Sequence, residues 1–197
     1  MGTRNLTMVI SEGKTKIAQY GQWDGYPSGQ GKTILNFLSK CADFGHFKEV
    51  IDKLRWITDK EGTDIDKDPN WVENYPYLSR DCGGQILNAV YNGAMEVSTG
   101  EIGKRKTIKV DVKFLSNSED FAAESLFCEW AYVIDLDKRT FEVYKGFNKK
   151  PLTEKDRFFK FSVDAGTEYN QVKMVKKYSL DKLPTEKEFL LYFAKKE

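Results

Sequence analysis

The sequence has little of what metal centres and disulfide scaffolds require. It contains one histidine, His46, so a site built from several histidines is excluded. Its three cysteines, Cys41, Cys82 and Cys128, are odd in number and far apart, which argues against a disulfide framework and is typical of a reducing compartment. We therefore expect free thiols in the core, no bound metal and no cofactor.

Long apolar runs and a surplus of one charge are missing as well. No stretch approaches the ~20 apolar residues needed to cross a bilayer, and residues 1–10 lack the apolar segment of a signal peptide. Lys and Arg total 31 against 30 Asp and Glu, a formal net charge of +1. Such a balance creates no global field for nucleic acid. These absences predict a cytoplasmic protein with neither a membrane nor a nucleic-acid polymer as its partner.

What the chain does contain is typical of a folded domain. Its 197 residues suffice for one domain with a real core, and 40% hydrophobic and 14% aromatic residues argue against disorder. We find no internal repeat, low-complexity tract or Gly/Ser linker. The sequence therefore predicts a single α+β domain over residues 1–197.

The hydrophobic periodicity changes along the chain. Alternation predicts a hairpin over residues 6–20, a strand over 108–114, a second hairpin over 126–145 and a strand over 172–178. Helical spacing predicts helices over 34–41, 47–57, 79–93 and 185–193, with Asp43 and Ser79 as N-caps, Gly93 as a terminator and a Thr185–Glu188 capping box. Residues 58–74 are polar and predict a loop. We expect a mostly antiparallel sheet built from hairpins, with three to four helices packed on it.

The most unusual segment is the turn Trp23-Asp24-Gly25-Tyr26-Pro27-Ser28-Gly29-Gln30-Gly31. Its glycines permit positive φ and close backbone approach, and a helix begins at Lys32. A glycine-rich approach to a helix N-terminus favours anion binding by backbone N–H groups, with Ser28 or Lys32 as further donors. Gly31-Lys32-Thr33 is not a P-loop, because Tyr26 occupies the place of its first glycine.

Aromatic and acidic side chains in the same turn suit a planar, hydroxylated ligand. Trp23 and Tyr26 can stack on a base, and Asp24 can accept hydrogen bonds from ribose or from a base edge. The alternative is that the segment forms consecutive turns with both aromatic rings tucked into the core.

Two further places qualify as anion contacts. Arg80 and Asp81 precede the adjacent glycines Gly83 and Gly84, which suggests close approach of a backbone or a ligand there, with helix packing as the alternative. Arg4 in the first strand is a third candidate, although exposed strand arginines are common.

The opening Met1-Gly2-Thr3-Arg4 and the turn from Trp23 to Gly31 resemble a group of poorly characterised phage and prophage-associated bacterial proteins. Their starts read similarly and carry an aromatic-Asp-(Gly/Ser)-Tyr-Pro-x-Gly turn after the first hairpin. The resemblance implies a phage context and transfers no catalytic residues.

We therefore hypothesise a phage-encoded, non-catalytic protein that sequesters a small anionic, nucleotide-derived immune signal of the host and so counteracts bacterial defence. The expected ligand-binding residues are Arg4, Trp23, Asp24, Tyr26, Ser28, Gly29, Gly31, Lys32, Arg80 and Asp81.

Two alternatives and the oligomeric state stay open. One alternative is a small hydrolase that uses Thr3 as an N-terminal nucleophile, or a cysteine, with Asp24 or Asp81 in acid–base work. The other is an inhibitor that presents Trp71, Tyr75 and Tyr77 to a host defence protein. A homo-oligomer is compatible with each of these hypotheses.

Overall fold

The computed structural model describes residues 2–41 and 43–194. The helices are α1 (Lys32–Lys40), α2 (Phe44–Asp52), α3 (Asp59–Asp66), α4 (Trp71–Asn74), α5 (Ile86–Asn92) and α6 (Glu186–Phe193). The strands are β1 (Asn5–Ser11), β2 (Lys14–Gly21), β3 (Arg55–Trp56), β4 (Ala94–Ser98), β5 (Arg105–Lys109), β6 (Phe114–Leu115), β7 (Trp130–Asp135), β8 (Thr140–Lys145) and β9 (Lys173–Ser179). Short helical turns are η1 (Pro27–Gly31), η2 (Pro76–Leu78), η3 (Gly83–Gln85), η4 (Glu119–Ala123) and η5 (Arg157–Lys160).

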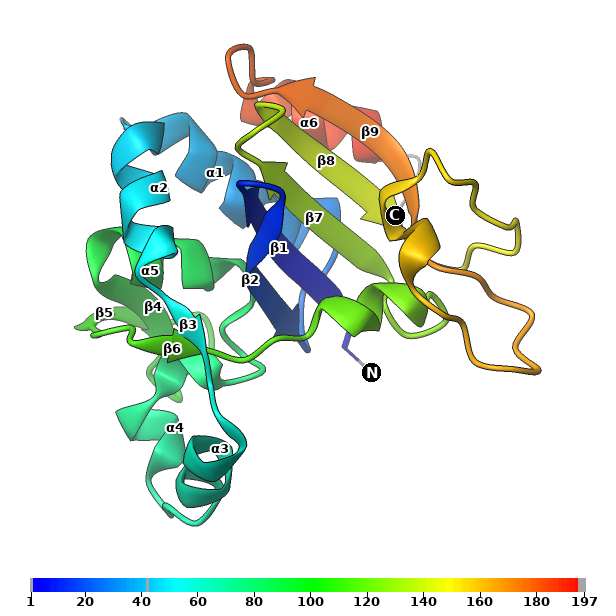
Figure 1. The fold of residues 1–197 in the computed structure, drawn as a ribbon. Coiled ribbons are helices and arrows are strands. Elements are labelled where there is room, and N and C mark those ends of the chain that lie inside the picture. The colour runs from blue at the N-terminus through cyan, green and yellow to red at the C-terminus, as the bar shows by residue number, and fades with distance from the viewer. Residues whose placement is uncertain (1, 42, 195–197) are drawn as a thin grey trace.

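The main sheet has five strands in the order β2-β1-β7-β8-β9 (Figure 1). The predicted hairpins β1–β2 and β7–β8 form, and β9 pairs antiparallel with β8. However, β1 pairs with β7 in parallel, with Asn5 opposite Trp130. The α+β class is therefore confirmed, whereas the prediction of a mostly antiparallel sheet is wrong because the sheet is mixed. The parallel pairing joins two distant segments and leaves no trace in local periodicity.

Both faces of this sheet are covered. Every residue of β1 is buried, as expected for a central strand with layers on either side. One face packs against α1, α2, α5 and α6, and the other against η4 and the long segment 146–172 (Figure 1). Phe158 of η5 and Leu152 supply apolar contacts to that second face.

The helix count exceeds the three to four that the sequence predicts, because the structure has six α-helices among its described residues. Two of them, α3 and α4, lie in the segment 58–74 that the sequence predicts as a loop. Thr58 and Glu61 form a capping box that starts α3. The buried side chain of Ile65 attaches this otherwise polar helix to the rest of the protein. None of the described helices is both long and apolar enough to cross a membrane.

The predicted strand over 108–114 is interrupted. β5 ends at Lys109 because its partner is β4, and β6 starts at Phe114 because its partner is β3. A single alternating run therefore serves two small sheets, which periodicity alone does not distinguish.

The predicted helix ends are largely confirmed. Asp43 accepts hydrogen bonds from the backbone N–H groups of Gly45 and His46, and Thr185 forms its capping box with Glu188. Gly93 ends α5 in the left-handed conformation with φ of 60°. Ser79 is not a helix cap, since η3 separates it from α5.

Candidate functional site

The turn Trp23–Gly31 is mostly helical rather than a pair of open turns. Over Pro27–Gly31 it forms one wide helical turn, η1, that runs directly into α1. The backbone N–H groups donate within the protein: Gly25 to Thr3 O (2.9 Å), Gly29 and Gly31 to Tyr26 O (2.9 and 3.3 Å), and Gln30 to Asp24 O (2.8 Å). The N–H of Lys32 is also bonded within η1. These N–H groups therefore have acceptors within the protein, Thr3 O for Gly25 and carbonyls of the turn itself for the others, and anion binding by them stays a prediction.

Two glycines of the turn are explained by packing. A Cβ on Gly29 would lie 2.2 Å from the carbonyl oxygen of Asp24, and one on Gly31 would lie 2.9 Å from the ring of Tyr132. The hydroxyl of Tyr132 also donates to Gly25 O at 2.8 Å. Gly29 thus allows the turn to close on itself, and Gly31 allows it to pack on the central strand β7.

The aromatic side chains of the turn stay at the surface. Trp23 is 46% exposed and Tyr26 is 41% exposed, so neither ring is tucked into the core. The indole Nε1 of Trp23 donates to Asp81 Oδ1 at 2.8 Å, and the N–H of Gln22 donates to Arg80 O at 2.9 Å. The two segments that the sequence singles out separately therefore lie side by side.

The side chain of Gln30 links the same two segments. Its Nε2 donates to Trp23 O at 3.3 Å, and its Oε1 accepts from the N–H of Gly84 at 2.8 Å. A Cβ on Gly83 would lie 2.8 Å from the Gln30 carboxamide, so the glycine pair admits this link. Close approach of a side chain explains Gly83 and Gly84 without a ligand.

Two arginines lie in segments that contact the turn. The guanidinium of Arg4 lies over the ring of Phe127, 4.7 Å from its centroid. Burial raises the pKa of Tyr20, and the positive charges of Arg4 and Arg80 partly offset that rise, so both charges act on the same phenol. We call the group Arg4, Tyr20, Trp23, Arg80 and Phe127 the arginine surface.

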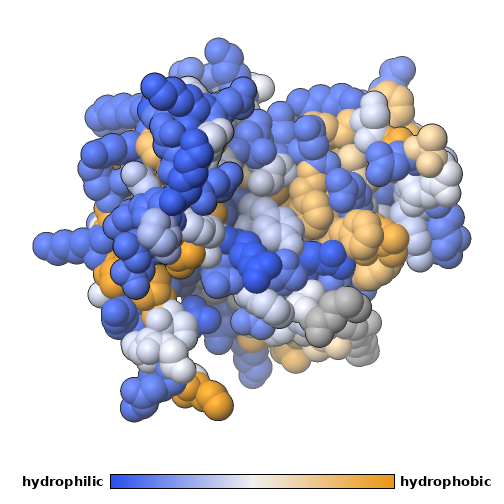
Figure 2. Space-filling model, turned by 90° about the horizontal axis from the view of Figure 1, so that it is seen from below, coloured by the Kyte–Doolittle hydropathy of each residue, from blue (hydrophilic) through white to orange (hydrophobic). Residues whose placement is uncertain are grey.

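The arginines of this surface differ from most others in the chain. Within residues 2–41 and 43–194, neither Arg4 nor Arg80 makes an ion pair, whereas Arg55, Arg139 and Arg157 each face a carboxylate. Phe127 is 43% exposed. Figure 2 views the molecule from below relative to Figure 1, and on that face apolar areas border strongly hydrophilic ones.

The remaining predicted residues lie elsewhere along the turn. Asp24 and Ser28 are exposed, and Asp24 has a positive φ of 54°. Lys32 pairs with Glu186 of α6 at 2.9 Å, and Gly31 is buried near Phe189 of the same helix. Neighbouring residues of a helical turn project to different sides. Gly31 and Lys32 therefore face α6, whereas Asp24 and Ser28 face solvent. A ligand role for these four residues stays a prediction.

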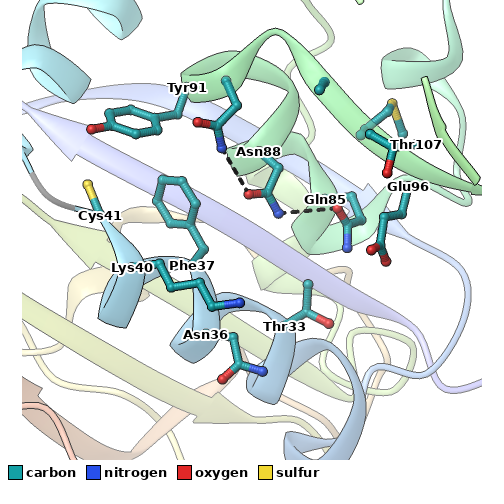
Figure 3. A pocket seen from close by; sticks show the side chains of 13 residues that line it. Thr33, Asn36, Phe37, Lys40, Cys41, Gln85, Asn88, Tyr91, Glu96 and Thr107 are labelled. Atoms are coloured by element: carbon teal, nitrogen blue, oxygen red, sulfur yellow. Dashed lines mark hydrogen bonds between the residues drawn. The ribbon is translucent and has the colours of Figure 1, made fainter. Parts of the chain in front are cut away.

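A cleft of about 510 Å³ lies between α1, α5 and the β4–β5 hairpin (Figure 3). Polar residues line it from both helices: Thr33, Asn36 and Lys40 from α1, and Gln85, Asn88 and Asn92 from α5 and its start. None of its lining residues is among those that the sequence predicts to bind a ligand. The sequence feature that could have indicated this cleft is the helical spacing of polar residues among the apolar residues of both helices.

A buried charge cluster lies on the opposite face of the sheet. Arg157 of η5 contacts Asp135 of β7 at 2.6 Å and Glu142 of β8 at 2.9 Å, beside a hollow of about 520 Å³. Burial raises the pKa of Glu142, but hydrogen bonds from Arg157 and Tyr144 outweigh it, so the pKa lies below its ordinary value. Burial and the Glu142 charge raise the pKa of Tyr144. Neither group is suited to proton transfer near neutral pH, and the cluster anchors segment 146–172 to the sheet.

The residues of the hydrolase alternative are not activated. Thr3 is buried, and its carbonyl accepts from Gly25. Burial raises the pKa of the Cys41, Cys82 and Cys128 thiols, which keeps them protonated at neutral pH. In the described residues, no group of three or more His, Cys, Asp or Glu could hold a metal ion.

The reactivity of the three cysteines tests whether burial keeps their thiols protonated and unreactive. We expect iodoacetamide to modify the half-buried Cys41 slowly in the native protein and to reach Cys82 and Cys128 after denaturation, because both latter thiols are buried. Peptide mass mapping with and without urea measures this order. Rapid native modification of Cys82 or Cys128 would contradict it and would revive a cysteine nucleophile.

The aromatic residues of the inhibitor alternative are mostly packed inside. Tyr77 is 2% exposed, and Trp71 and Tyr75 are half-buried. The ring of Tyr75 lies 5.9 Å from that of Phe114. Tyr77 likewise lies against Phe114 of β6, at 6.3 Å between ring centroids, so these two tyrosines offer little surface to a partner, and a role for Trp71 stays a prediction.

No protein-family model, curated protein or solved structure matches the chain.

Proposed function

We propose that this protein binds a small anionic, nucleotide-derived ligand at the arginine surface and holds it without turnover. The phage resemblance extends the proposal: the ligand is an immune signal of the bacterial host, captured in the cytoplasm to blunt defence. The observation that carries the proposal is that the segments bearing Arg4 and Arg80 both contact the turn. The N–H of Gly25 donates to Thr3 O at 2.9 Å, and the N–H of Gln22, beside the exposed Trp23, donates to Arg80 O at 2.9 Å.

The charge of this surface favours an anion. Guanidinium groups bind phosphate through two parallel hydrogen bonds, and such bonds are stronger than those between neutral groups. Because no described carboxylate pairs with Arg4 or Arg80, an anion there would displace no existing ion pair. Asp81 is already held by Trp23 Nε1 at 2.8 Å.

The aromatic rings favour a ligand with a planar part. Trp23 and Phe127 are each more than two-fifths exposed, at 46% and 43%. Base-on-ring stacking contributes about 1–3 kcal/mol per base. A phosphate on the arginines and a base on an aromatic ring together describe a nucleotide.

Binding without turnover follows from the chemistry around the surface. A general acid or base works best with a pKa near the working pH. Burial raises the pKa of Tyr20, which keeps the phenol neutral, and Cys128 is likewise protonated. These groups can position a ligand but are poorly suited to attack it.

Calorimetry against cyclic oligonucleotides and ADP-ribose derivatives tests the proposal. We expect tight binding of at least one compound and its recovery intact after the protein is denatured. Arg4→Gln and Arg80→Gln should each weaken binding by about 10- to 100-fold, since a hydrogen bond to a charged group contributes about 1.5–3 kcal/mol.

Arg105→Gln is the matched control, because Arg105 is exposed on β5, away from the arginine surface, and should leave binding unchanged. Absence of binding across the panel would refute the proposal. Recovery of a cleaved ligand would show that the protein is an enzyme and would contradict binding without turnover.

A further inference from the structure

Two polar stripes face each other across the cleft between α1 and α5. Thr33, Asn36 and Lys40 follow i, i+3, i+7 spacing on α1, and Gln85, Asn88 and Asn92 follow the same spacing at α5. Residues three and four apart share one face of a helix. Helices that lie beside each other normally meet through apolar side chains, so this polar facing is unusual.

The hydrogen-bonding capacity of the stripes is not used across the cleft. Asn92 donates to Asn88, and Asn88 donates to Gln85, so the three carboxamides form one chain along α5. Thr33 donates to Gly29 O, and Asn36 to Glu186, both away from α5. Among the described residues, no hydrogen bond joins the α1 stripe to the α5 stripe.

Side chains with unused hydrogen-bonding groups line the cleft from both helices. In the described part of the chain, Gln85 Nε2 has no acceptor and Lys40 has no ion pair. Figure 3 shows the Lys40 side chain on one side of the cleft and Gln85 and Asn88 on the other. Donors and acceptors therefore line the same space from two directions.

The remaining walls fit a neutral, partly aromatic molecule. The rings of Phe37 and Tyr91 meet edge to face at 5.7 Å and close one end. One cation, Lys40, and one anion, Glu96, line the cleft, so its lining carries no net charge. A volume of about 510 Å³ is within the range of small-molecule sites.

We infer that this cleft is a second binding site, distinct from the arginine surface, and that it takes an uncharged ribonucleoside. A planar carboxamide offers a donor and an acceptor side by side, which matches the edge of a nucleobase. The Asn88–Gln85 chain reads that edge, and Lys40 and Thr107 contact the ribose hydroxyls. This inference does not depend on the proposed function.

Titration of the protein with adenosine, guanosine, cytidine, uridine and free ribose tests the inference by chemical-shift perturbation. We expect at least one ribonucleoside to bind and to shift the amides of Gln85 and Asn88, with ribose binding much more weakly. Asn88→Leu and the nearly isosteric Gln85→Met should each weaken binding about tenfold or more, since a bidentate base contact contributes about 1–3 kcal/mol.

Arg80→Gln is the control and should leave nucleoside binding unchanged. The inference is overturned if no nucleoside binds at millimolar concentration, if ribose binds equally well, or if Asn88→Leu and Gln85→Met bind like the natural protein. Loss of nucleoside binding in Arg80→Gln would also overturn it, because the ligand would then belong to the arginine surface. Gln85→Met keeps the test valid should Asn88→Leu fail to fold.

Discussion

Replacing Arg157 with methionine is expected to lower the free energy of unfolding by about 3–5 kcal/mol. The side chains of Asp135 and Glu142 are 2% and 6% exposed, and Arg157 contacts both. Without the guanidinium, Glu142 would stay buried with no cationic partner, and Asp135 would keep only Lys138, whose Nζ lies 3.8 Å from its Oδ2. Urea unfolding at pH 7 measures the loss.

The same replacement should reverse the pH dependence of stability. In the natural protein the pKa of Glu142 is lowered, so its contribution is complete above the ordinary carboxyl pKa and is lost as the pH falls through the lowered value. In Arg157→Met, only the hydrogen bonds from Tyr144 and Thr140 oppose the effect of burial on Glu142, so its pKa should rise above the ordinary value. The variant should therefore gain stability as the pH falls from 7 toward 5, where the natural protein stays level.

Arg139→Met provides the comparison. Arg139 pairs with Asp181 at the surface, with side chains 52% and 61% exposed, and removal of an exposed pair should cost less than about 1 kcal/mol. If Arg157→Met cost no more than this, the buried cluster would not be what holds segment 146–172 on the sheet.

Phe189→Ala is expected to destabilise the protein by about 3–5 kcal/mol. Phe189 is fully buried, and its ring lies 6.1 Å from that of Phe141 and 4.9 Å from that of Phe193. Its loss would leave a cavity between α6 and the sheet. Thermal and urea unfolding measure the change, and Leu191→Ala, at a side chain 65% exposed, should stay within about 0.5 kcal/mol of the natural protein.

The same cavity predicts a coupling with Gly31. A Cβ there would lie 3.2 Å from Phe189 Cε1 and 2.9 Å from Tyr132 Cε1, so Gly31→Ala alone should cost about 1–3 kcal/mol. In the Phe189→Ala background the added methyl enters vacated space, and its cost should fall by about 0.5 kcal/mol or more. Strict additivity would show that η1 does not pack against α6 as described.

Local signals predicted the local parts of this fold. Asp43 and Thr185 cap their helices as their neighbours suggest, and alternation identified both hairpins. Thr58 and Glu61 carried the same capping signal, but the polarity of the residues that follow concealed α3. The parallel pairing of β1 with β7 depends on contacts between distant segments, which no local pattern encodes.

The sites show the same division. The glycine-rich turn, the Gly83–Gly84 pair and the first strand singled out Trp23, Arg80 and Arg4, whereas Tyr20 and Phe127 join this surface only through folding. The cleft between α1 and α5 depends on two helices facing each other, so Lys40 and Asn88 read as ordinary polar residues in the sequence. Asp135 is an acidic residue in a strand that is otherwise apolar, whereas the strand of Glu142 also carries Thr140 and Lys145.

The parallel pairing of β1 with β7 also governs how the chain folds during synthesis. Asn5 meets Trp130, so 125 further residues must be made before β1 gains this neighbour. At about 5–20 residues per second this takes roughly 6–25 s. Throughout that interval the hairpin β1–β2 presents an apolar, unpaired edge of the kind that aggregates. Translation speed and chaperone capture of the nascent chain should therefore set the yield of soluble protein more than the stability of the finished fold.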